Sequence, residues 1–369
     1  MKLRHVWFSL AMLVSGIVTH GHANELRQTT LFAAGEGGYH TYRIPALIAT
    51  KSGALLAFCE GRKAGRSDAG NIDVLVKRSL DNGKTWEATQ VVWDDADNTC
   101  GNPCPVVDAN TGVIHLLLTH NRGDDVEEKI TAGQAKGTRT VWIAQSSDDG
   151  ATWSKPVEIT RDVKKAHWTW YATGPGIGIQ LKSGRLLVPC DNKVLGTKAH
   201  QSHVIYSDDG GESWRIGGVV GPGCNECQAV ELADGTVMLN MRSYRGDKRR
   251  LVALSKDGGE TFGDAKSDEA LIEPVCQASI LRYPGERGGI LFSNPASTKR
   301  ENMTVRLSRD EGKTWPYAKT LFPGQSAYSC LAVLRDGRVA CLYEAGEEHY
   351  SHGLTLATFT LDELTEREE

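Results

Sequence analysis

The chain has 369 residues, of which 40% are hydrophobic and 24% are charged. This balance is typical of a globular protein, and it excludes an intrinsically disordered chain, a coiled coil and a multi-span membrane protein. With 42 basic against 46 acidic residues the formal net charge is −4, which gives no support for nucleic-acid binding. The 40 glycines, against only 12 prolines, favour many tight turns between short strands.

The N-terminus carries the three-part pattern of a secretory signal. Lys2 and Arg4 precede an apolar stretch over residues 6–18, and Gly21 and Ala23 place small residues before a cut after Ala23. The stretch is too short to cross a bilayer comfortably, and an uncleaved anchor is the alternative. We therefore predict a signal peptide over 1–23, export to the periplasm or the extracellular space, and a single domain over 24–369 without stable membrane insertion.

All nine cysteines follow this segment. Four of them stand inside apolar, strand-like runs, where a free cysteine behaves as a small hydrophobic side chain: Cys59, Cys190, Cys330 and Cys341. The close pairs Cys100/Cys104 and Cys224/Cys227 have mixed spacings that fit a zinc site poorly. In an oxidising compartment we expect at least one disulfide, whose partners the sequence does not identify.

A pattern of the form Ser-x-Asp-x-Gly-x-(Thr/Ser)-(Trp/Phe), here called an Asp box, occurs five times. The copies begin at Ser79, Ser146, Ser207, Ser255 and Ser308. Each follows a strand-like run and predicts a tight turn, because the Asp accepts backbone N–H groups and the Gly adopts the left-handed conformation. An EF-hand loop is excluded, since the glutamate at the twelfth position and the ladder of oxygen ligands are absent.

A second pattern, a turn that ends in Gly and leads into an apolar strand, occurs six times. The glycines are Gly53, Gly112, Gly184, Gly235, Gly289 and Gly337, with intervals of 59, 72, 51, 54 and 48 residues. Repeats near this length that consist of hairpins are typical of propeller blades. We therefore predict an all-β fold, a six-bladed β-propeller.

Polar residues follow the apolar strands of the second pattern, at the point where each strand ends. They are Glu60, Arg62, Asp191, Arg242, Arg300 and Glu344. We assign these strands to the inside of the propeller, where strand ends surround one mouth, so these arginines and carboxylates should face one another. Charges scattered over the surface are the alternative, but such charges would not recur at the same position of each repeat.

Together with the Asp boxes, the Tyr42-Arg43-Ile44-Pro45 motif resembles the exo-α-sialidases (neuraminidases) of the bacterial and animal type. Further matching stretches are 174–181, 225–228, 240–243, 293–295 and 327–329, so the resemblance covers about residues 26–361. Asp boxes alone occur in unrelated propellers, whereas the Arg-Ile-Pro motif makes the resemblance specific. It implies hydrolysis of terminal α-linked sialic acid from sialylated glycans, glycoproteins or glycolipids.

The resemblance also implies a carboxylate clamp. Arg43, Arg242 and Arg300 correspond to the family's arginine triad, and guanidinium forks bind a carboxylate in a bidentate way that lysine cannot copy. Glu344 corresponds to the carboxylate that braces the first arginine, with an exposed rim charge as the alternative.

By the same resemblance, Tyr328 corresponds to the nucleophile and Glu226 to its general base. Sialic acid carries a carboxylate on its anomeric carbon, so an Asp or Glu nucleophile would approach a like charge, which a neutral phenol avoids. Attack by Tyr328 and then by water inverts one carbon twice, which implies net retention. A packed strand aromatic is the alternative interpretation of Tyr328.

For the acid, the sequence offers Asp68 and Asp73. Asp68 lies in a Gly-flanked loop and matches the family's acid/base position, so we choose Asp68 to protonate the leaving oxygen and later deprotonate water. Asp73 falls inside a strand-like run, where it could make a fixed contact. Arg62 matches an additional arginine near C4 of the sugar, and we expect Arg66 to lie in solvent.

Several features leave alternatives open. The aromatic cluster at residues 167–171 fits either a wall of the substrate pocket or packing between blades. No histidine spacing resembles a metal site, so we expect no metal. We also expect no cofactor and a monomeric protein. A trans-sialidase, or an inactive propeller that only binds sialic acid, is the alternative function. Tyr328, Glu226 and Asp68 together argue against the inactive propeller, since binding needs only the arginines.

Overall fold

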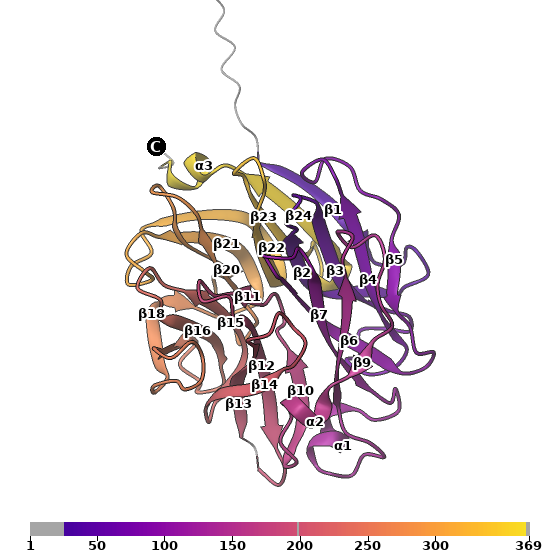
Figure 1. The fold of residues 1–369 in the computed structure, drawn as a ribbon. Coiled ribbons are helices and arrows are strands. Elements are labelled where there is room, and N and C mark those ends of the chain that lie inside the picture. Colours follow the sequence, from indigo (N-terminus) through magenta and orange to yellow (C-terminus); the bar gives the residue numbers. More distant parts are fainter. Residues whose placement is uncertain (1–25, 198, 367–369) are drawn as a thin grey trace, which may run out of the picture.

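The computed structural model of the protein describes residues 26–197 and 199–366, and the predicted signal peptide lies outside them. In these residues the chain forms mostly antiparallel β-sheet, which confirms the predicted all-β class (Figure 1). The short helical segments are α1 (Glu127–Thr131), α2 (Thr160–Val163), α3 (Leu361–Thr365) and the 3-10 turn η1 (Tyr350–His352). No helix within 26–197 and 199–366 is long and apolar enough to cross a membrane.

The strands form four sheets, which divide into six antiparallel units in sequence order. The first unit contains β2 (Thr41–Ala49), β3 (Leu55–Arg62), β4 (Ile72–Ser79) and β5 (Gln90–Trp93). The second unit contains β6 (Thr99–Val107), β7 (Ile114–Asn121), β8 (Thr140–Ser146) and β9 (Val157–Glu158). One parallel pairing, between β4 of the first unit and β6 of the second, joins these two units. The third is β10 (Trp168–Thr173) and β11 (Ile179–Gln180), which both pair with β12 (Leu186–Val194), then β13 (His200–Ser207) and β14 (Arg215–Val220). The fourth is β15 (Cys224–Glu231), β16 (Val237–Ser243), β17 (Arg249–Ser255) and β18 (Lys266–Ile272).

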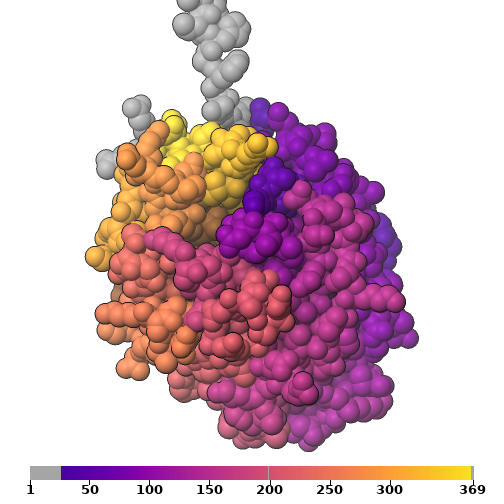
Figure 2. Space-filling view, in the orientation of Figure 1, coloured from indigo at the N-terminus to yellow at the C-terminus, as the bar shows by residue number. Residues whose placement is uncertain are grey.

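The last two units share one long strand. The fifth unit is β19 (Ser279–Tyr283), β20 (Gly289–Pro295), β21 (Glu301–Ser308) and the first part of β22 (Tyr317–Val333). The rest of β22 pairs with β23 (Val339–Gly346), followed by β24 (Gly353–Phe359) and β1 (Arg27–Ala33). The first described strand, β1, therefore completes the last unit, and Figure 2 shows the indigo segment that follows residue 25 beside the yellow C-terminal one.

Neighbouring units meet mainly through their first strands. β2 contacts β6, β6 contacts β10, β15 contacts β12 and β19, and β22 contacts both β19 and β2, so the series of contacts returns to its start. The apolar runs after the Gly turns, which we predicted to be the inner strands, are instead the second strand of each unit. The prediction was wrong because first and second strands are equally apolar: β2 and β3 are both buried almost throughout.

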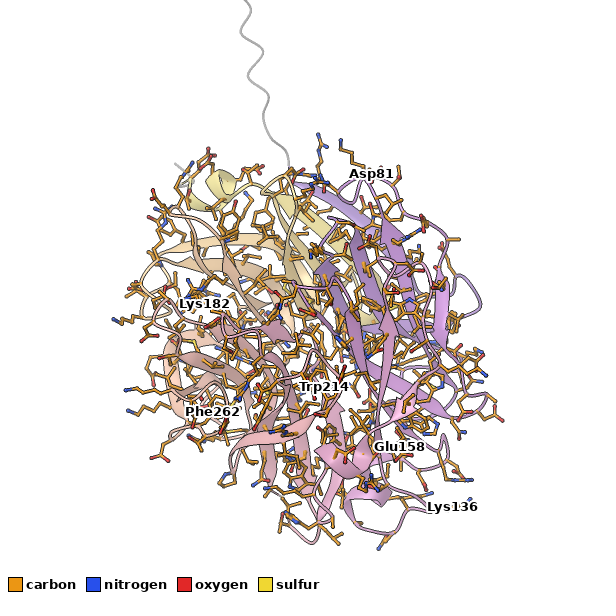
Figure 3. The ribbon with its side chains drawn as sticks, viewed as in Figure 1. Asp81, Lys136, Glu158, Lys182, Trp214 and Phe262 are labelled. Carbon is orange, nitrogen blue, oxygen red and sulfur yellow. The ribbon has the colours of Figure 1, made fainter. Side chains whose placement is uncertain are left out.

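The five Asp boxes are turns between the third and fourth strands of the first five units. In the first box, both carboxylate oxygens of Asp81 accept from Thr85, at 2.9 Å from its N–H and 2.7 Å from its hydroxyl. These bonds to Thr85 lower the pKa of Asp81 to about 2, and Gly83 has the predicted positive φ of 80°. Asp81, Trp214 and Phe262, from three different boxes, are labelled in Figure 3.

The expected disulfide is not present. All nine cysteines, which belong to the described part of the chain, are buried free thiols. Burial raises the pKa of the Cys224 thiol and of the Cys276 thiol to about 11, so both stay protonated at neutral pH. The cysteines act as small apolar side chains in the core, as the apolar runs around four of them indicated.

The Asp boxes generate a stability prediction. Asp310→Ala removes the acceptors of the Thr314 N–H at 2.8 Å, the Thr314 hydroxyl at 2.6 Å and the Ser308 hydroxyl at 2.8 Å. We expect the free energy of unfolding to fall by about 1–2 kcal/mol, because hydrogen bonds to a carboxylate are lost from a turn that needs them. Thermal unfolding followed by circular dichroism measures this. Lys313→Ala, an exposed change in the same turn, is the control, and equal melting temperatures for both variants would contradict the prediction.

Candidate active site

One cavity, with a volume of about 320 Å³, opens where first and second strands of several units end. This volume falls in the range of small-molecule sites. Seven of the eight residues to which the resemblance gives a role line it, and so do Glu60 and Asp191 from the strand ends; the seven are Arg43, Arg62, Asp68, Glu226, Arg242, Arg300 and Tyr328. Glu344, the eighth, lies behind Arg43 and is fully buried, so it is not an exposed rim charge. The fold thus joins residues as far as 301 positions apart.

Irregular strand pairing aims three of these side chains at the cavity. The pairing register shifts in β2 directly after Arg43, in β15 around Glu226 and in β22 around Tyr328. In β2 the irregularity includes Ile44, whose φ is 61°. A β-bulge bends its strand and redirects side chains, and bulges are frequent beside active sites. Strand alternation alone does not predict these directions.

Glu344 holds Arg43 in a bidentate ion pair. Its Oε1 accepts from Arg43 Nε at 2.9 Å and its Oε2 from Arg43 Nη2 at 3.1 Å. Burial opposes the charge of Arg43, but Glu344 outweighs burial and raises the pKa of Arg43. Because Nε and Nη2 are taken, Nη1 is the nitrogen of Arg43 that remains for a ligand.

The Tyr328 hydroxyl is bound to a carboxylate and an arginine. It donates to Glu226 Oε1 and accepts from Arg242 Nη1 at 3.2 Å, while the same nitrogen donates to Glu226 Oε2 at 2.7 Å. Burial raises the pKa of Tyr328 and Glu226 raises it further, whereas Arg242, Arg300 and Arg43 act in the opposite direction. The phenol is therefore neutral at rest and surrounded by the charges that would stabilise its anion.

Arg300 completes the group of arginines around Tyr328. Its Cζ atom lies 5.7 Å from the centre of the Tyr328 ring, and Arg43 Cζ lies at 4.9 Å. Within the described part of the chain, Arg300 donates only to neutral acceptors, the Tyr350 hydroxyl at 3.2 Å and the Val275 carbonyl at 3.3 Å. Its charge is thus left for an anionic ligand. Its neighbours in sequence, Arg306 and Arg309, do not line this cavity.

Asp68 reaches the cavity from a loop and pairs with two arginines. Its Oδ1 lies 2.7 Å from Arg62 Nη2 and 3.6 Å from Arg43 Nη1, and its side chain is 59% exposed. Desolvation works against its charge, but Arg62 and Arg43 outweigh it and lower the pKa of Asp68. Arg62 is itself held by Glu60 at 2.7 Å.

The competing residue Asp73 makes the fixed contact that its strand position suggested. It accepts from the Tyr39 hydroxyl at 2.6 Å, pairs with Lys63 at 3.1 Å and is 1% exposed. Asp73 does not line the cavity, and Arg66 does so only as an exposed side chain. Of the two carboxylates, only Asp68 can therefore meet a bound ligand.

The cavity also contains residues that sequence reasoning missed or left open. Arg139 is 2% exposed and stacks on Trp170 with its Cζ 3.9 Å from the ring centre. Two of its nitrogens, Nε and Nη1, have no hydrogen-bond partner among the residues that the structure describes. Trp170 faces the cavity, whereas Trp168 and Tyr171 pack in the core, so the aromatic cluster is divided between the cavity wall and the core. Arg139 directly precedes β8, outside the strand-end pattern, and no sequence signal marks it.

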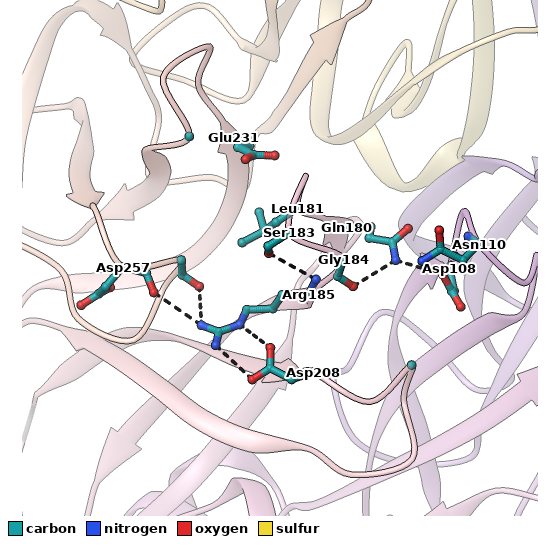
Figure 4. Close-up of a pocket in the computed structure, with 13 residues that line it drawn as sticks. Asp108, Asn110, Gln180, Leu181, Ser183, Gly184, Arg185, Asp208, Glu231 and Asp257 are labelled. Atoms are coloured by element: carbon teal, nitrogen blue, oxygen red, sulfur yellow. Dashed lines mark hydrogen bonds and ion pairs between the residues drawn. The ribbon is translucent and has the colours of Figure 1, made fainter.

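A larger cavity, of about 690 Å³, lies among turns that include parts of two Asp boxes (Figure 4). Its central cation, Arg185, is already paired: Nε lies 2.7 Å from Asp208 and Nη2 lies 2.9 Å from Glu260. None of the residues expected to carry chemistry lines it. Within 26–197 and 199–366, no group of three or more His, Cys, Asp or Glu side chains is arranged to hold a metal ion.

Comparisons with known proteins address the family of the chain. A model of the BNR repeat-like domain matches residues 53–341. The chain is 37% identical to a sialidase of Micromonospora viridifaciens, with 89% of this chain and 52% of the relative covered. It is 32% identical to the exo-alpha-sialidase of Aspergillus fumigatus, with 84% and 79% covered. The chain belongs to the BNR-repeat sialidase family.

Solved structures of sialidases share the fold of this family member. The Hadza microbial sialidase Hz136 superimposes with a TM-score of 0.84 at 32% identity, covering 91% of this chain and 69% of that one. A leech intramolecular trans-sialidase gives a TM-score of 0.80 at 20% identity, covering 92% and 71%, which is a likeness of fold alone. The chain spans about half the length of the Micromonospora relative.

Proposed function

We propose that the protein is an exo-α-sialidase that hydrolyses terminal α-linked sialic acid from glycans, glycoproteins or glycolipids with net retention. The observation that carries this proposal is the hydrogen bond from the Tyr328 hydroxyl to Glu226, inside a cluster of three arginines. A buried phenol that donates its proton in a hydrogen bond to a carboxylate can be activated as a nucleophile, because the carboxylate can take that proton as a general base. The three positive charges select a substrate that carries an anion next to the reacting carbon.

Substrate binding uses the donors that the free site leaves open. The carboxylate of sialic acid binds Arg43 Nη1, Arg242 and Arg300, because charge-assisted bonds from guanidinium forks are strong and directional. Arg43 keeps its position since Glu344 holds its other two nitrogens. The clamp sets the anomeric carbon above the Tyr328 oxygen.

In the first step the Tyr328 oxygen attacks the anomeric carbon while its proton passes to Glu226. Asp68, protonated in the complex, gives its proton to the glycosidic oxygen, and the bond from that oxygen to the anomeric carbon breaks. In the second step Asp68 takes a proton from water, and that water attacks the same carbon. The bond to Tyr328 breaks, and Glu226 returns the proton to the phenolate. Two inversions at one carbon give retention.

Two other functions share part of this machinery. A trans-sialidase would pass the sugar to another glycan in place of water, and an inactive propeller would only bind sialic acid. If the folded protein releases the fluorophore from an aryl α-sialoside, it is an enzyme and not a module that only binds sialic acid. Product analysis with and without added lactose as acceptor separates hydrolysis from transfer.

The proposal also covers the architecture of the protein, its location and its oligomeric state. We infer that the six units are blades of a closed propeller, which the returning series of contacts between first strands supports. We also infer export, on the charged and apolar pattern of residues 1–23, and action as a monomer without metal or cofactor.

Tyr328→Phe tests the nucleophile. The lost hydroxyl is hydrogen-bonded to the charged side chains of Glu226 and Arg242, a contribution of about 1.5–3 kcal/mol, so the melting temperature should fall by only a few degrees while the fold is retained. Turnover of natural sialosides should fall by at least roughly a thousandfold, because no covalent intermediate can form. Any residual cleavage of an aryl sialoside should proceed by direct attack of water and invert the anomeric carbon, which NMR of the first-formed anomer detects. Full activity with retention would show that another group is the nucleophile.

The position of Asp68 predicts that the protein takes up a proton when a ligand binds. In the free site Arg62 and Arg43 lower the pKa of Asp68, so the carboxyl is ionised at neutral pH. A ligand carboxylate that takes Arg43 Nη1 removes one of these stabilising contacts and adds a like charge, so the pKa of Asp68 must rise. Binding of a planar sialic acid glycal should therefore take up as much as about one proton at pH values between the pKa of Asp68 in the free site and its pKa in the complex, and binding should weaken as the pH rises through that interval.

Calorimetric titration in buffers with different ionisation enthalpies measures this uptake. Asp68→Asn should bind the glycal with no uptake from this group, which makes it the matched control. Equal proton uptake in the parent and in Asp68→Asn would assign the proton to another residue.

A further inference from the structure

A second fully buried ion pair lies next to the candidate active site. Glu273, which directly follows β18, and Arg250, on β17, are both 0% exposed, and Glu273 Oε2 lies 3.1 Å from Arg250 Nη1. Neither side chain lines the active-site cavity. A buried ion pair adds little net stability, because the loss of hydration offsets most of the attraction between its charges. What this pair holds in place is therefore its informative property.

Glu273 joins the end of one strand to a turn. Its Oε1 accepts from the Ser243 N–H at 2.8 Å, and its Oε2 accepts from the Cys276 N–H at 3.1 Å. The first N–H belongs to the peptide group that follows Arg242, at the end of β16. The second belongs to the peptide group that follows Val275, in the turn between β18 and β19. One carboxylate thus fixes two peptide groups in two separate segments of the chain.

The peptide group between Val275 and Cys276 connects Glu273 with Arg300. Its N–H donates to Glu273, and its carbonyl oxygen, which belongs to Val275, accepts from Arg300 Nη2 at 3.3 Å. A peptide group is planar and rigid, so holding its N–H also sets the direction of its carbonyl. Hydrogen bonds in such a chain polarise one another, which makes the carbonyl a better acceptor for Arg300.

The backbone at Val275 needs this support. Its φ is 60°, a left-handed conformation that a β-branched side chain disfavours. Glu273 holds the Cys276 N–H, and Arg250 Nη1 donates to the Cys276 carbonyl at 2.7 Å. Arg250 is itself anchored to β16, because its Nε donates to Asn240 Oδ1 at 2.7 Å. Strained backbone persists only where the surrounding contacts determine it, and such strain is concentrated at functional sites.

The turn also packs against the proposed nucleophile. Cys276 belongs to the same small buried cluster as Tyr328 and Ile44, and Tyr350 packs against this cluster. The Tyr350 hydroxyl is the other acceptor of Arg300. A shift of the turn would therefore move both groups that hold Arg300.

We propose that Glu273 is a positioning residue for Arg242 and Arg300, as Glu344 is for Arg43. It acts through the two peptide groups that accept its support, and not by contact with a ligand. This inference rests on the proposed function, in which these arginines bind the carboxylate of the sugar. Loss of Glu273 should therefore weaken the binding of the ligand's carboxylate and leave the ligand's other contacts unchanged.

A planar sialic acid glycal and its methyl ester together measure what the carboxylate contributes to binding. We expect the parent protein to bind the acid at least about a hundredfold more tightly than the ester, because the ester loses charge-assisted bonds to guanidinium groups. In Glu273→Gln this ratio of dissociation constants should fall by about tenfold, since an amide NH2 group cannot accept from a backbone N–H. The dissociation constant of the ester should change by less than about threefold.

Glu273→Asp is the second variant. It keeps a negative charge beside Arg250, but a side chain shorter by one methylene cannot reach both peptide groups, so the ratio should fall by about threefold or more. Asp108→Asn is the matched control, because Asp108 is also a buried carboxylate, 3% exposed, and accepts from the Asn110 N–H at 2.9 Å. Asp108 lines the larger cavity of Figure 4 and not the active-site cavity, so the control should keep the parent ratio.

Circular dichroism at the temperature of the binding measurement establishes that each variant is folded, and Glu273→Asp decides if Glu273→Gln is not. The parent ratio in a folded Glu273 variant would overturn the proposal, and so would an equal loss in Asp108→Asn. If the parent protein binds the acid no better than the ester, it is the proposed function that fails.

Discussion

The buried carboxylate of Glu344 is the contact on which the candidate site depends. Its Oε1 accepts from Arg43 Nε and the Ile44 N–H, and its Oε2 accepts from Arg43 Nη2 and the Tyr328 N–H. One side chain on β23 therefore fixes an arginine on β2 and the backbone that carries the phenol on β22. A fully buried charge is tolerated only when it is paired and hydrogen-bonded, and here both oxygens are.

This arrangement keeps positive charge available where a ligand would bind. Among residues 26–197 and 199–366, Arg300 has only neutral acceptors, and Arg43 Nη1 pairs only with Asp68, at 3.6 Å. The neutral phenol of Tyr328 lies beneath both guanidinium groups. Such a cleft focuses its field on an incoming anion. The same field would lower the cost of forming a phenolate, so one set of charges can serve binding and the proposed attack.

The sequence anticipated the composition of the site better than its geometry. Arg43 and Tyr328 stand in motifs of a few residues that can be recognised without a structure. Arg139 could not be found, because it belongs to no motif and its place beside Trp170 is set by contacts between separate units. The choice of Asp68 over Asp73 rested on loop against strand position, and Asp73 is indeed held by Tyr39 and Lys63.

By itself the sequence determined the all-β class, the five Asp-box turns and the kinds of side chain at the strand ends. These features depend on backbone geometry and hydrogen bonds within a few residues, so a local pattern is enough to specify them. Only the tertiary structure decided which strands meet between units, that the cysteines remain free thiols, and that bulges turn Arg43, Glu226 and Tyr328 toward one cavity. Those outcomes depend on packing between segments hundreds of residues apart, which no local pattern contains.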